Sequence, residues 1–377
     1  MKYPKRSSAT RMDPYYEYED EQVYAFRPLY EEIWAAIRLL GVRDIGYKQL
    51  RKRFPDRRER PLRQIASMLG SCITQAEEYF RLALEANSRV APLLHYYSML
   101  NLTKALIYLD APARLADRNG LRHGLSDPAR RKDSDAYSFG DEVVKVTDGV
   151  FPSLYFVLTG KELNRGNSYN LRYLLQYCAW MNSEFEQIYS EPCKLVHAAL
   201  RVATDAEARS VRLQAEVYRD EIESHCGTVS AFGALAEPFS SLFQRVAPDK
   251  PETLSYETEP IYYDHGRQRL ASIEKLRTAM RRVRLHRPFV HSGESATTEY
   301  LIPLRETGTE PLPEPCVLFA ITFYLGSLVR YQPHIYDRIL GTEEAWLLES
   351  YVRQCPIAFA HIMLNHLWRT EHLFLRR

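Results

Sequence analysis

This sequence of 377 residues lacks the features that mark membrane, secreted and zinc-ribbon proteins. No apolar run approaches the roughly 20 residues that span a bilayer. The basic N-terminus is not followed by the apolar stretch of a secretory signal. The six cysteines are scattered and form no C-x-x-C pair, which disfavours a disulfide framework or a zinc ribbon. We therefore expect a cytoplasmic protein without a membrane segment.

The chain also lacks the short motifs of several common enzyme classes. The motifs G-x-x-x-x-G-K-[ST], G-x-G-x-x-G and G-x-S-x-G are all missing, which disfavours a P-loop enzyme, a Rossmann dehydrogenase and an α/β-hydrolase. His361, His366 and His372 near the C-terminus do not spell H-E-x-x-H. We expect neither a metal nor a cofactor.

Charge is balanced globally but not locally. The net charge of +2 gives no global argument for nucleic-acid binding. The strongest positive segment is KQLRKRFPDRRERPLR, in which Pro55 and Pro61 predict a linker or two short pieces. Two interpretations stay open, a solvated linker or contact with nucleic-acid phosphates. The candidate nucleic-acid-binding residues are Arg51, Lys52, Arg53, Arg57 and Arg58.

Helical periodicity dominates much of the chain. Two long helices are predicted between Leu62 and Leu109, with a break at Asn87-Ser88, and these should form an antiparallel pair. The second is apolar nearly all round, so it should be the buried central helix. Further helices are predicted at residues 22–40, 170–189, 192–203, 206–226, 317–336 and 343–369.

Strand signals are confined to two regions. EVVKVTDGVFPSLYFVL alternates on both sides of Asp148-Gly149, which predicts a two-residue β-hairpin. TLSYETEPIYY, RRVRLHRPFVH and TTEYLIPL predict short strands around the helix RQRLASIEKLRTAMRR. The predicted fold class is mainly α, with an inserted β-hairpin and a small antiparallel sheet. Its three predicted domains are an N-terminal arm, helix and basic linker (1–61), a helical core with the hairpin (62–250), and strands with C-terminal helices (251–377).

Five blocks of sequence follow one another along the chain: LLHYYSMLNLTKALIYLDAP, HGLSD, DEVVKVTDGVFPSLYFVLTG, LGSLVRYQPHIYDRIL and PIAFAHIMLNHL. These blocks and their order resemble the YaaC-like proteins. The resemblance covers roughly Leu62 to the C-terminus. It implies a fold more than a reaction, because the family has no established reaction. The arm and the basic linker before Leu62 look like an addition to that core.

The aromatic pair Tyr96-Tyr97 is followed some twenty residues later by a His-Gly turn. This arrangement is loosely similar to the helical pair of HEPN domains, which implies an HEPN-like helical-hairpin core. Catalytic HEPN members use an Arg, often followed by Asn, and a nearby His. Arg118, Asn119 and His123 match that pattern. The similarity implies metal-independent RNA cleavage, in which the His moves a proton and the Arg holds the phosphate.

The spacing R-x-x-x-x-H carries no weight by itself, because 39 arginines and 11 histidines in 377 residues give about one match by chance and the chain has two. Gly120 and Gly124 disfavour the helix on which catalytic HEPN motifs lie. The alternative is a turn in which His123 caps or packs. Arg330, at the end of a predicted helix, either binds a ligand or pairs with a buried carboxylate.

Three classes of function remain. The favoured one is a non-catalytic helical module that binds RNA, a nucleotide or a partner protein. The alternative is a metal-independent HEPN-type ribonuclease acting as a toxin or antiphage effector, and the third is a metabolic enzyme with an unrecognised site. Whether the chain is an enzyme stays open. The partners to consider are RNA, a nucleotide, another protein and a second copy of the chain, and we expect no membrane partner.

Overall fold

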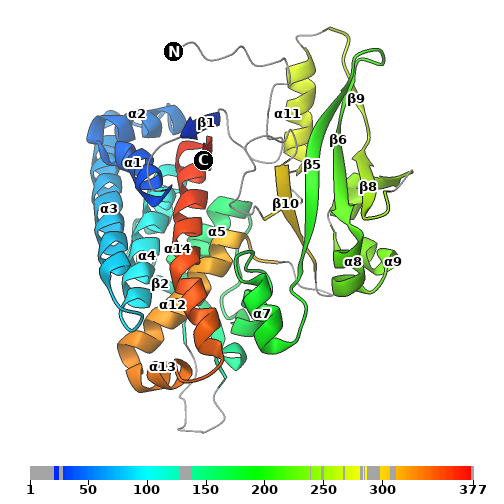
Figure 1. Cartoon of the computed structure of the whole chain (residues 1–377). Coiled ribbons are helices and arrows are strands. Elements are labelled where there is room, and N and C mark those ends of the chain that lie inside the picture. Colours follow the sequence, from blue (N-terminus) through cyan, green and yellow to red (C-terminus); the bar gives the residue numbers. More distant parts are fainter. Residues whose placement is uncertain are drawn as a thin grey trace, which may run out of the picture. The chain divides into compact units, whose positions relative to one another are not determined.

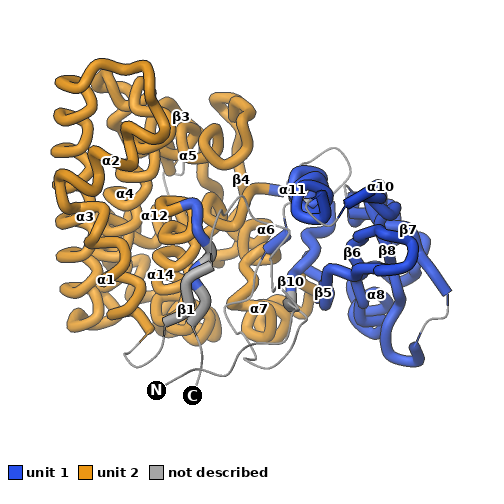
Figure 2. The backbone as a smooth tube through the Cα atoms, turned by 90° about the horizontal axis from the view of Figure 1, so that it is seen from above, with its two compact units in different colours: residues 1–25, 194–311, 369–377 blue, residues 26–193, 312–368 orange. Residues whose placement is uncertain are grey.

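The computed structural model describes residues 21–24, 29–127, 138–237, 239–247, 250–265, 268–280, 283, 285–286, 298–305 and 311–374. The chain forms two compact units, which Figure 2 distinguishes by colour. The helical unit comprises residues 26–193 and 312–368, and the sheet unit comprises residues 1–25, 194–311 and 369–377. The domains predicted from the sequence stay a prediction. The predicted arm at residues 1–20 and most of RRVRLHRPFVH lie outside the described residues.

Ten α-helices of the described residues build the helical unit (Figure 1). They are α1 (Leu29–Gly41), α2 (Arg43–Arg53), α3 (Glu59–Glu85), α4 (Ala91–Asp110), α5 (Val150–Thr159), α6 (Leu171–Leu175), α7 (Asn182–Tyr189), α12 (Glu314–Tyr331), α13 (Pro333–Ile339) and α14 (Glu344–Trp368). Short 3-10 helices span Pro112–Leu115 and Phe139–Asp141. No helix in the described residues is long and apolar enough to cross a membrane.

The predicted pair of long helices is confirmed as α3 and α4. Helix α4 packs against α3, α5, α12 and α14, which explains why its sequence is apolar nearly all round. Tyr96, Met99, Leu102 and Leu106 on α4 are all buried. The buried central helix predicted from the sequence is therefore confirmed, and other helices of the unit pack around it.

A three-stranded antiparallel sheet lies within the helical unit, in the order β2 (His123–Ser126), β3 (Val143–Gly149) and β4 (Ser168–Asn170). The predicted hairpin at Asp148-Gly149 is wrong, because β3 ends at Gly149 and α5 begins at the next residue. Gly149 has a φ of 146°, and a side chain there would meet the Arg122 carbonyl oxygen at 2.4 Å. The glycine thus allows close approach of β2 rather than a two-residue turn.

The sheet unit is built on a six-stranded antiparallel sheet in the order β10-β5-β6-β8-β7, with β9 beside β6. Its strands are β5 (Leu195–Asp205), β6 (Ser210–Tyr218), β7 (Phe243–Val246), β8 (Thr253–Thr258), β9 (Ile261–Tyr262) and β10 (Thr298–Pro303). Its helices are α8 (Arg219–Cys226), α9 (Val229–Leu235), α10 (Phe239–Leu242) and α11 (Gln268–Met280). A separate parallel pair joins β1 (Glu21–Tyr24) to β11 (Glu371–Phe374).

The helices predicted at residues 192–203 and 206–226 are wrong over most of their length, because β5 and β6 form a long hairpin there. Val196, Ala198 and Leu200 are buried at alternate positions of β5, and they pack in a core with side chains of α11 such as Leu276. The Ala, Leu and Glu content suits a helix locally, but pairing with β8 and β10 overrides that preference.

The predicted fold class was mainly α, with an HEPN-like core, an inserted hairpin and a small sheet. This prediction is wrong. The chain has a second unit with a six-stranded sheet and a hydrophobic core of its own. The predicted strands at TLSYETEPIYY and TTEYLIPL do occur, as β8, β9 and β10. They are part of that larger sheet.

Candidate ligand-binding site in the helical unit

A pocket of about 350 Å³ lies beside α4, β2 and the C-terminal end of α12. This volume is within the range of about 300–1,000 Å³ that is usual for small-molecule sites. Aromatic, polar and charged side chains line it together. The lining residues are Leu93, Tyr96, Tyr97, His123, Leu125, Ser126, Asp127, Phe323, Gly326, Ser327, Arg330, Tyr331 and Gln332. We refer to it as the α4–α12 pocket.

A tyrosine–histidine pair forms one wall of this pocket. The hydroxyl of Tyr96 is hydrogen-bonded to Nδ1 of His123. Burial raises the pKa of Tyr96 far above its ordinary value, so the hydroxyl keeps its proton. Burial, followed by the charges of Lys104 and Arg330, lowers the pKa of His123, so the imidazole is neutral near pH 7.

These protonation states favour one tautomer of His123. The protonated hydroxyl of Tyr96 donates to Nδ1, since no other hydrogen-bond partner of this hydroxyl occurs in the described part of the chain. The proton of the neutral imidazole is then on Nε2. His123 can therefore offer an N–H donor to a ligand in the pocket.

Packing of α4 against α12 fixes the position of Tyr96. The Tyr96 ring makes edge-to-face contacts with Phe319 and Phe323, at centroid distances of 5.8 and 5.5 Å. A Cβ atom at Gly326 would lie 3.1 Å from Cβ of Tyr96. The lack of a side chain at Gly326 thus lets the two helices approach closely at the pocket.

Arg330 supplies the permanent cation of the pocket. Its Nη1 donates to the hydroxyl of Tyr97 at 2.9 Å, and its guanidinium lies 4.9 Å from the centre of the Tyr331 ring. Among the residues that the structure describes, no carboxylate pairs with Arg330. The sequence left open that Arg330 pairs with a buried carboxylate, and the described residues contain no such pair. Burial and then the charges of Lys104 and Arg330 lower the pKa of His123, although Asp127 also lines the pocket.

The predicted catalytic residues do not lie together at this pocket. RNGLRH forms a turn that leads into β2, and Arg122 N–H donates to the carbonyl of Asn119 at 3.1 Å. Arg118 and Asn119 are exposed and do not line the pocket, whereas His123 does. Catalysis by these three residues stays a prediction.

The predicted nucleic-acid-binding residues fall into two groups. Arg51 and Lys52 on α2, and Arg57 and Arg58 in the next turn, are exposed. Arg53 is different, because its side chain is 5% exposed, pairs with Asp110 at 2.8 Å and donates to a backbone carbonyl of α14 at 2.5 Å. Arg53 is therefore part of the structure rather than an accessible phosphate contact.

The sequence analysis did not single out three residues that shape the pocket, Phe323, Gly326 and Ser327. A usable signal was present in ITFYLGSLVRY, where Gly326-Ser327 interrupts large apolar side chains one turn before Arg330. Small residues followed by a cation on a buried helix indicate a place where another element or a ligand comes close.

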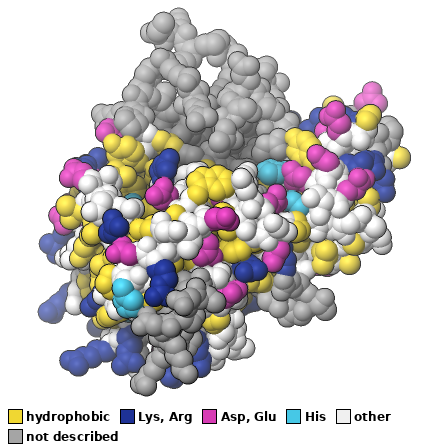
Figure 3. Space-filling view, turned by 60° about the horizontal axis from the view of Figure 1, so that its bottom comes forward, with side chains coloured by type: hydrophobic (Ala, Val, Ile, Leu, Met, Phe, Trp, Pro, Cys, Tyr) yellow, Lys and Arg dark blue, Asp and Glu magenta, His cyan; other side chains and the backbone are white. Residues whose placement is uncertain are grey.

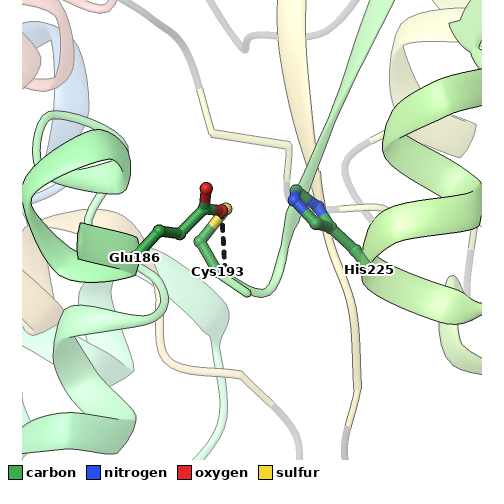
Figure 4. Close-up of side chains that lie close together, drawn as sticks. All are labelled: Glu186, Cys193 and His225. Atoms are coloured by element: carbon green, nitrogen blue, oxygen red, sulfur yellow. Dashed lines mark hydrogen bonds between the residues drawn. The ribbon is translucent and has the colours of Figure 1, made fainter. Parts of the chain in front are cut away.

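Figure 4 draws three further side chains that could ligate a metal, Glu186, Cys193 and His225. Glu186 accepts a hydrogen bond from the backbone N–H of Cys193 at 3.1 Å, within the helical unit. His225 belongs to the sheet unit. Because these side chains come from two separate units, we assign no metal site to them.

The fold and the pocket define an α+β protein with a candidate ligand site in its helical unit. The chain belongs to the family described as YaaC-like Protein, whose model matches residues 44–367. The resemblance to YaaC-like proteins is thus confirmed, and the similarity to HEPN domains is not shown. The match begins before Leu62 and includes the whole basic segment, so this segment is not an addition to the family region. No curated protein and no solved structure matches the chain.

Proposed function

We propose that this YaaC-like protein is a non-catalytic binding protein, and that its α4–α12 pocket holds a small anionic ligand of the mononucleotide class. The observation that carries the proposal is the placement of Arg330, without a carboxylate partner in the described residues, in one pocket with the Tyr96–His123 pair. A guanidinium and an N–H donor are the groups that recognise a phosphate.

The local field supports an anionic ligand. Burial lowers the pKa of His123, and the charges of Lys104 and Arg330 lower it further, so two cations act on this wall of the pocket. A neutral His123 with its proton on Nε2 adds a donor without adding charge. Phosphate oxygens accept hydrogen bonds from both kinds of group.

The remaining lining supports an aromatic group beside the anion. Tyr97, Phe323 and Tyr331 line the pocket, and the residue Tyr331 is 66% exposed. Exposed aromatic rings stack on nucleobases, with a contribution of about 1–3 kcal/mol per base. The volume of about 350 Å³ restricts the ligand to a small molecule.

The state of His123 favours binding over catalysis. A general base needs an available lone pair within reach of the proton that it abstracts. In the tautomer inferred above, Nδ1 accepts from Tyr96 and Nε2 carries the proton. A proton-transfer role would therefore require the pair to rearrange first.

Thermal shifts with matched ligands test the proposal. We expect AMP, GMP, CMP or UMP to raise the melting temperature more than the corresponding nucleoside, because the phosphate binds Arg330. Saturation at a hundred times Kd corresponds to about 2.7 kcal/mol. Arg330→Gln should remove the advantage of the nucleotide, whereas Arg165→Gln, which removes an exposed arginine paired with Asp148, should keep it. Equal shifts for nucleotide and nucleoside would reject the proposal.

The sequence also offered an alternative function, metal-independent RNA cleavage by Arg118, Asn119 and His123. A cleavage assay distinguishes this alternative from the binding proposal. The alternative requires wild-type activity that persists in EDTA and disappears in Arg118→Ala. We expect no cleavage, because Arg118 does not line the pocket with His123. Activity that needs both residues would replace the binding proposal.

A further inference from the structure

A separate charged surface of the helical unit lies where α2 ends and α3 begins. Six exposed cations occur between residues 48 and 60, and we call them the α2–α3 corner: Lys48, Arg51, Lys52, Arg57, Arg58 and Arg60. The same segment contains two acids, Asp56 and Glu59. Glu59 is already paired with Arg63, at 2.5 Å. The corner therefore carries a large local excess of positive charge in a chain of net charge +2.

Helix geometry places three of these cations on one face. Lys48, Arg51 and Lys52 are spaced i, i+3 and i+4, so they are neighbours on the surface of α2. The other side of α2 is buried, and a Cβ atom at Gly46 would lie 3.1 Å from a methyl carbon of Leu69 on α3. The cations cannot turn inward without breaking this packing.

Local contacts hold the turn that follows α2. Arg51 donates to the backbone carbonyl of Arg57 at 2.8 Å, and the Arg57 guanidinium lies 4.7 Å from the centre of the Phe54 ring. The buried pair of Arg53 with Asp110 anchors the end of α2 to α4. These contacts hold the turn and the Arg51 and Arg57 side chains, so less conformational entropy is lost at these two positions when a partner binds.

We infer that the α2–α3 corner binds the phosphate backbone of a nucleic acid. Four of its six cations are arginines, whose planar forks match phosphate oxygens. No large hydrophobic side chain is exposed from residue 48 to 60, so the corner lacks the apolar centre of a protein interface and the side chains that enter a membrane. On most of the face in Figure 3, by contrast, acidic, basic and hydrophobic side chains are intermingled.

This inference does not depend on the α4–α12 pocket, and its test uses other ligands. Anisotropy is measured with a labelled 20-nucleotide single-stranded RNA and a 20-base-pair DNA, at 50 to 300 mM KCl. Six phosphate contacts give a slope of log K against log salt of about −4 for a single strand. We expect a slope of this order for the wild type.

Two variants with equal charge change isolate the surface. The corner variant replaces all six corner cations by Gln, and we expect affinity at 100 mM KCl to fall at least tenfold and the slope to approach zero. The control variant replaces six exposed arginines elsewhere in the helical unit and should keep affinity within threefold. Its positions are Arg81, Arg89, Arg122, Arg165, Arg338 and Arg353. A smaller variant, Arg57→Gln with Arg58→Gln, should lower the slope magnitude by about 1.4 if the larger one does not fold.

Three results would overturn the inference. Equal loss of affinity in the corner and control variants would mean that total charge, not the corner, sets binding. Absence of wild-type binding at 50 mM KCl would remove the interaction itself. Binding to phosphatidylserine vesicles at protein concentrations that bind neither nucleic acid would assign the corner to a membrane surface.

Discussion

Replacing Tyr96 by Phe tests the hydrogen bond that organises the α4–α12 pocket. The substitution keeps the ring between Phe319 and Phe323 and removes the hydroxyl that contacts Nδ1 of His123. An unsatisfied buried acceptor costs about 1–3 kcal/mol. His123 is half-buried, so water can replace part of the lost bond. We therefore expect the free energy of unfolding to fall by about 1 kcal/mol, at the low end of that range.

The same substitution should change the tautomer of His123. Without the Tyr96 donor, Nδ1 can carry the proton, and the N–H donor facing the ligand is then lost in part of the population. In the wild type, ¹⁵N NMR of labelled histidine should give a pyridine-like signal for Nδ1 and a pyrrole-like signal for Nε2. In Tyr96→Phe the two signals should move toward each other. Urea denaturation gives the stability of both proteins.

A wild-type His123 that carries its proton on Nδ1 would refute this reasoning, because Tyr96 would then be the acceptor. Full retention of stability in Tyr96→Phe, together with an unchanged ¹⁵N spectrum, would also refute it. Both measurements are made without a ligand. They therefore test the tyrosine–histidine pair separately from the ligand class.

Other substitutions probe the fold around the pocket. Gly326→Ala gains about 1 kcal/mol of helix propensity but crowds Tyr96 at 3.1 Å, so urea denaturation should give a net loss of about 1 kcal/mol, whereas Gly233→Ala, with open space around it, should not destabilise. Burial lowers the pKa of His95 to about 4 from 6.5, so its stabilising contribution is present above pH 6.5 and lost as the pH falls toward 4. His95→Leu should therefore reduce the loss of stability between pH 7.5 and 4 by about 3 kcal/mol in urea titrations, and an unchanged pH dependence would contradict the burial. Arg53→Gln removes the ion pair of a largely buried carboxylate, Asp110, and should cost about 3 kcal/mol, and a loss below 0.5 kcal/mol, roughly that of a surface pair, would contradict it.

The central helices could be predicted from the sequence because their high content of apolar residues indicates burial. Helix α4 is apolar nearly all round and is buried against α3, α5, α12 and α14. Helix α14 was also predicted, although Pro356 lies inside it. A proline costs about 3 kcal/mol in an isolated helix, and packing of the buried flanking residues offsets this cost.

The sheet unit could not be predicted in the same way because its strands pair over long sequence distances. Val196 and Leu200 fit a helical spacing as well as an alternating one. The choice between them depends on β10, which pairs with β5 from about 100 residues further along the chain. At Gly149, a local turn signal was correct about the need for glycine and wrong about the structure that follows.

The candidate site was only partly visible in the sequence. His123 and Arg330 were both candidates from the sequence. The sequence could not decide between catalysis and a packed turn for His123, or between ligand binding and an ion pair for Arg330. Tyr96 was placed on a buried helix, and nothing in the sequence joined it to His123. The pocket exists because α12 packs on α4, more than 200 residues earlier in the chain, and Gly326 permits the close approach. No local pattern encodes that contact.

Calorimetric titration of AMP and adenosine into the wild type and Arg330→Gln tests the central claim most directly. A charge-assisted hydrogen bond to the phosphate is worth about 1.5–3 kcal/mol, which corresponds to about tenfold or more in affinity. We expect the wild type to bind AMP at least tenfold more tightly than adenosine, and Arg330→Gln to bind the two equally. Equal affinity of the wild type for AMP and adenosine, or an unchanged preference in Arg330→Gln, would contradict the central claim.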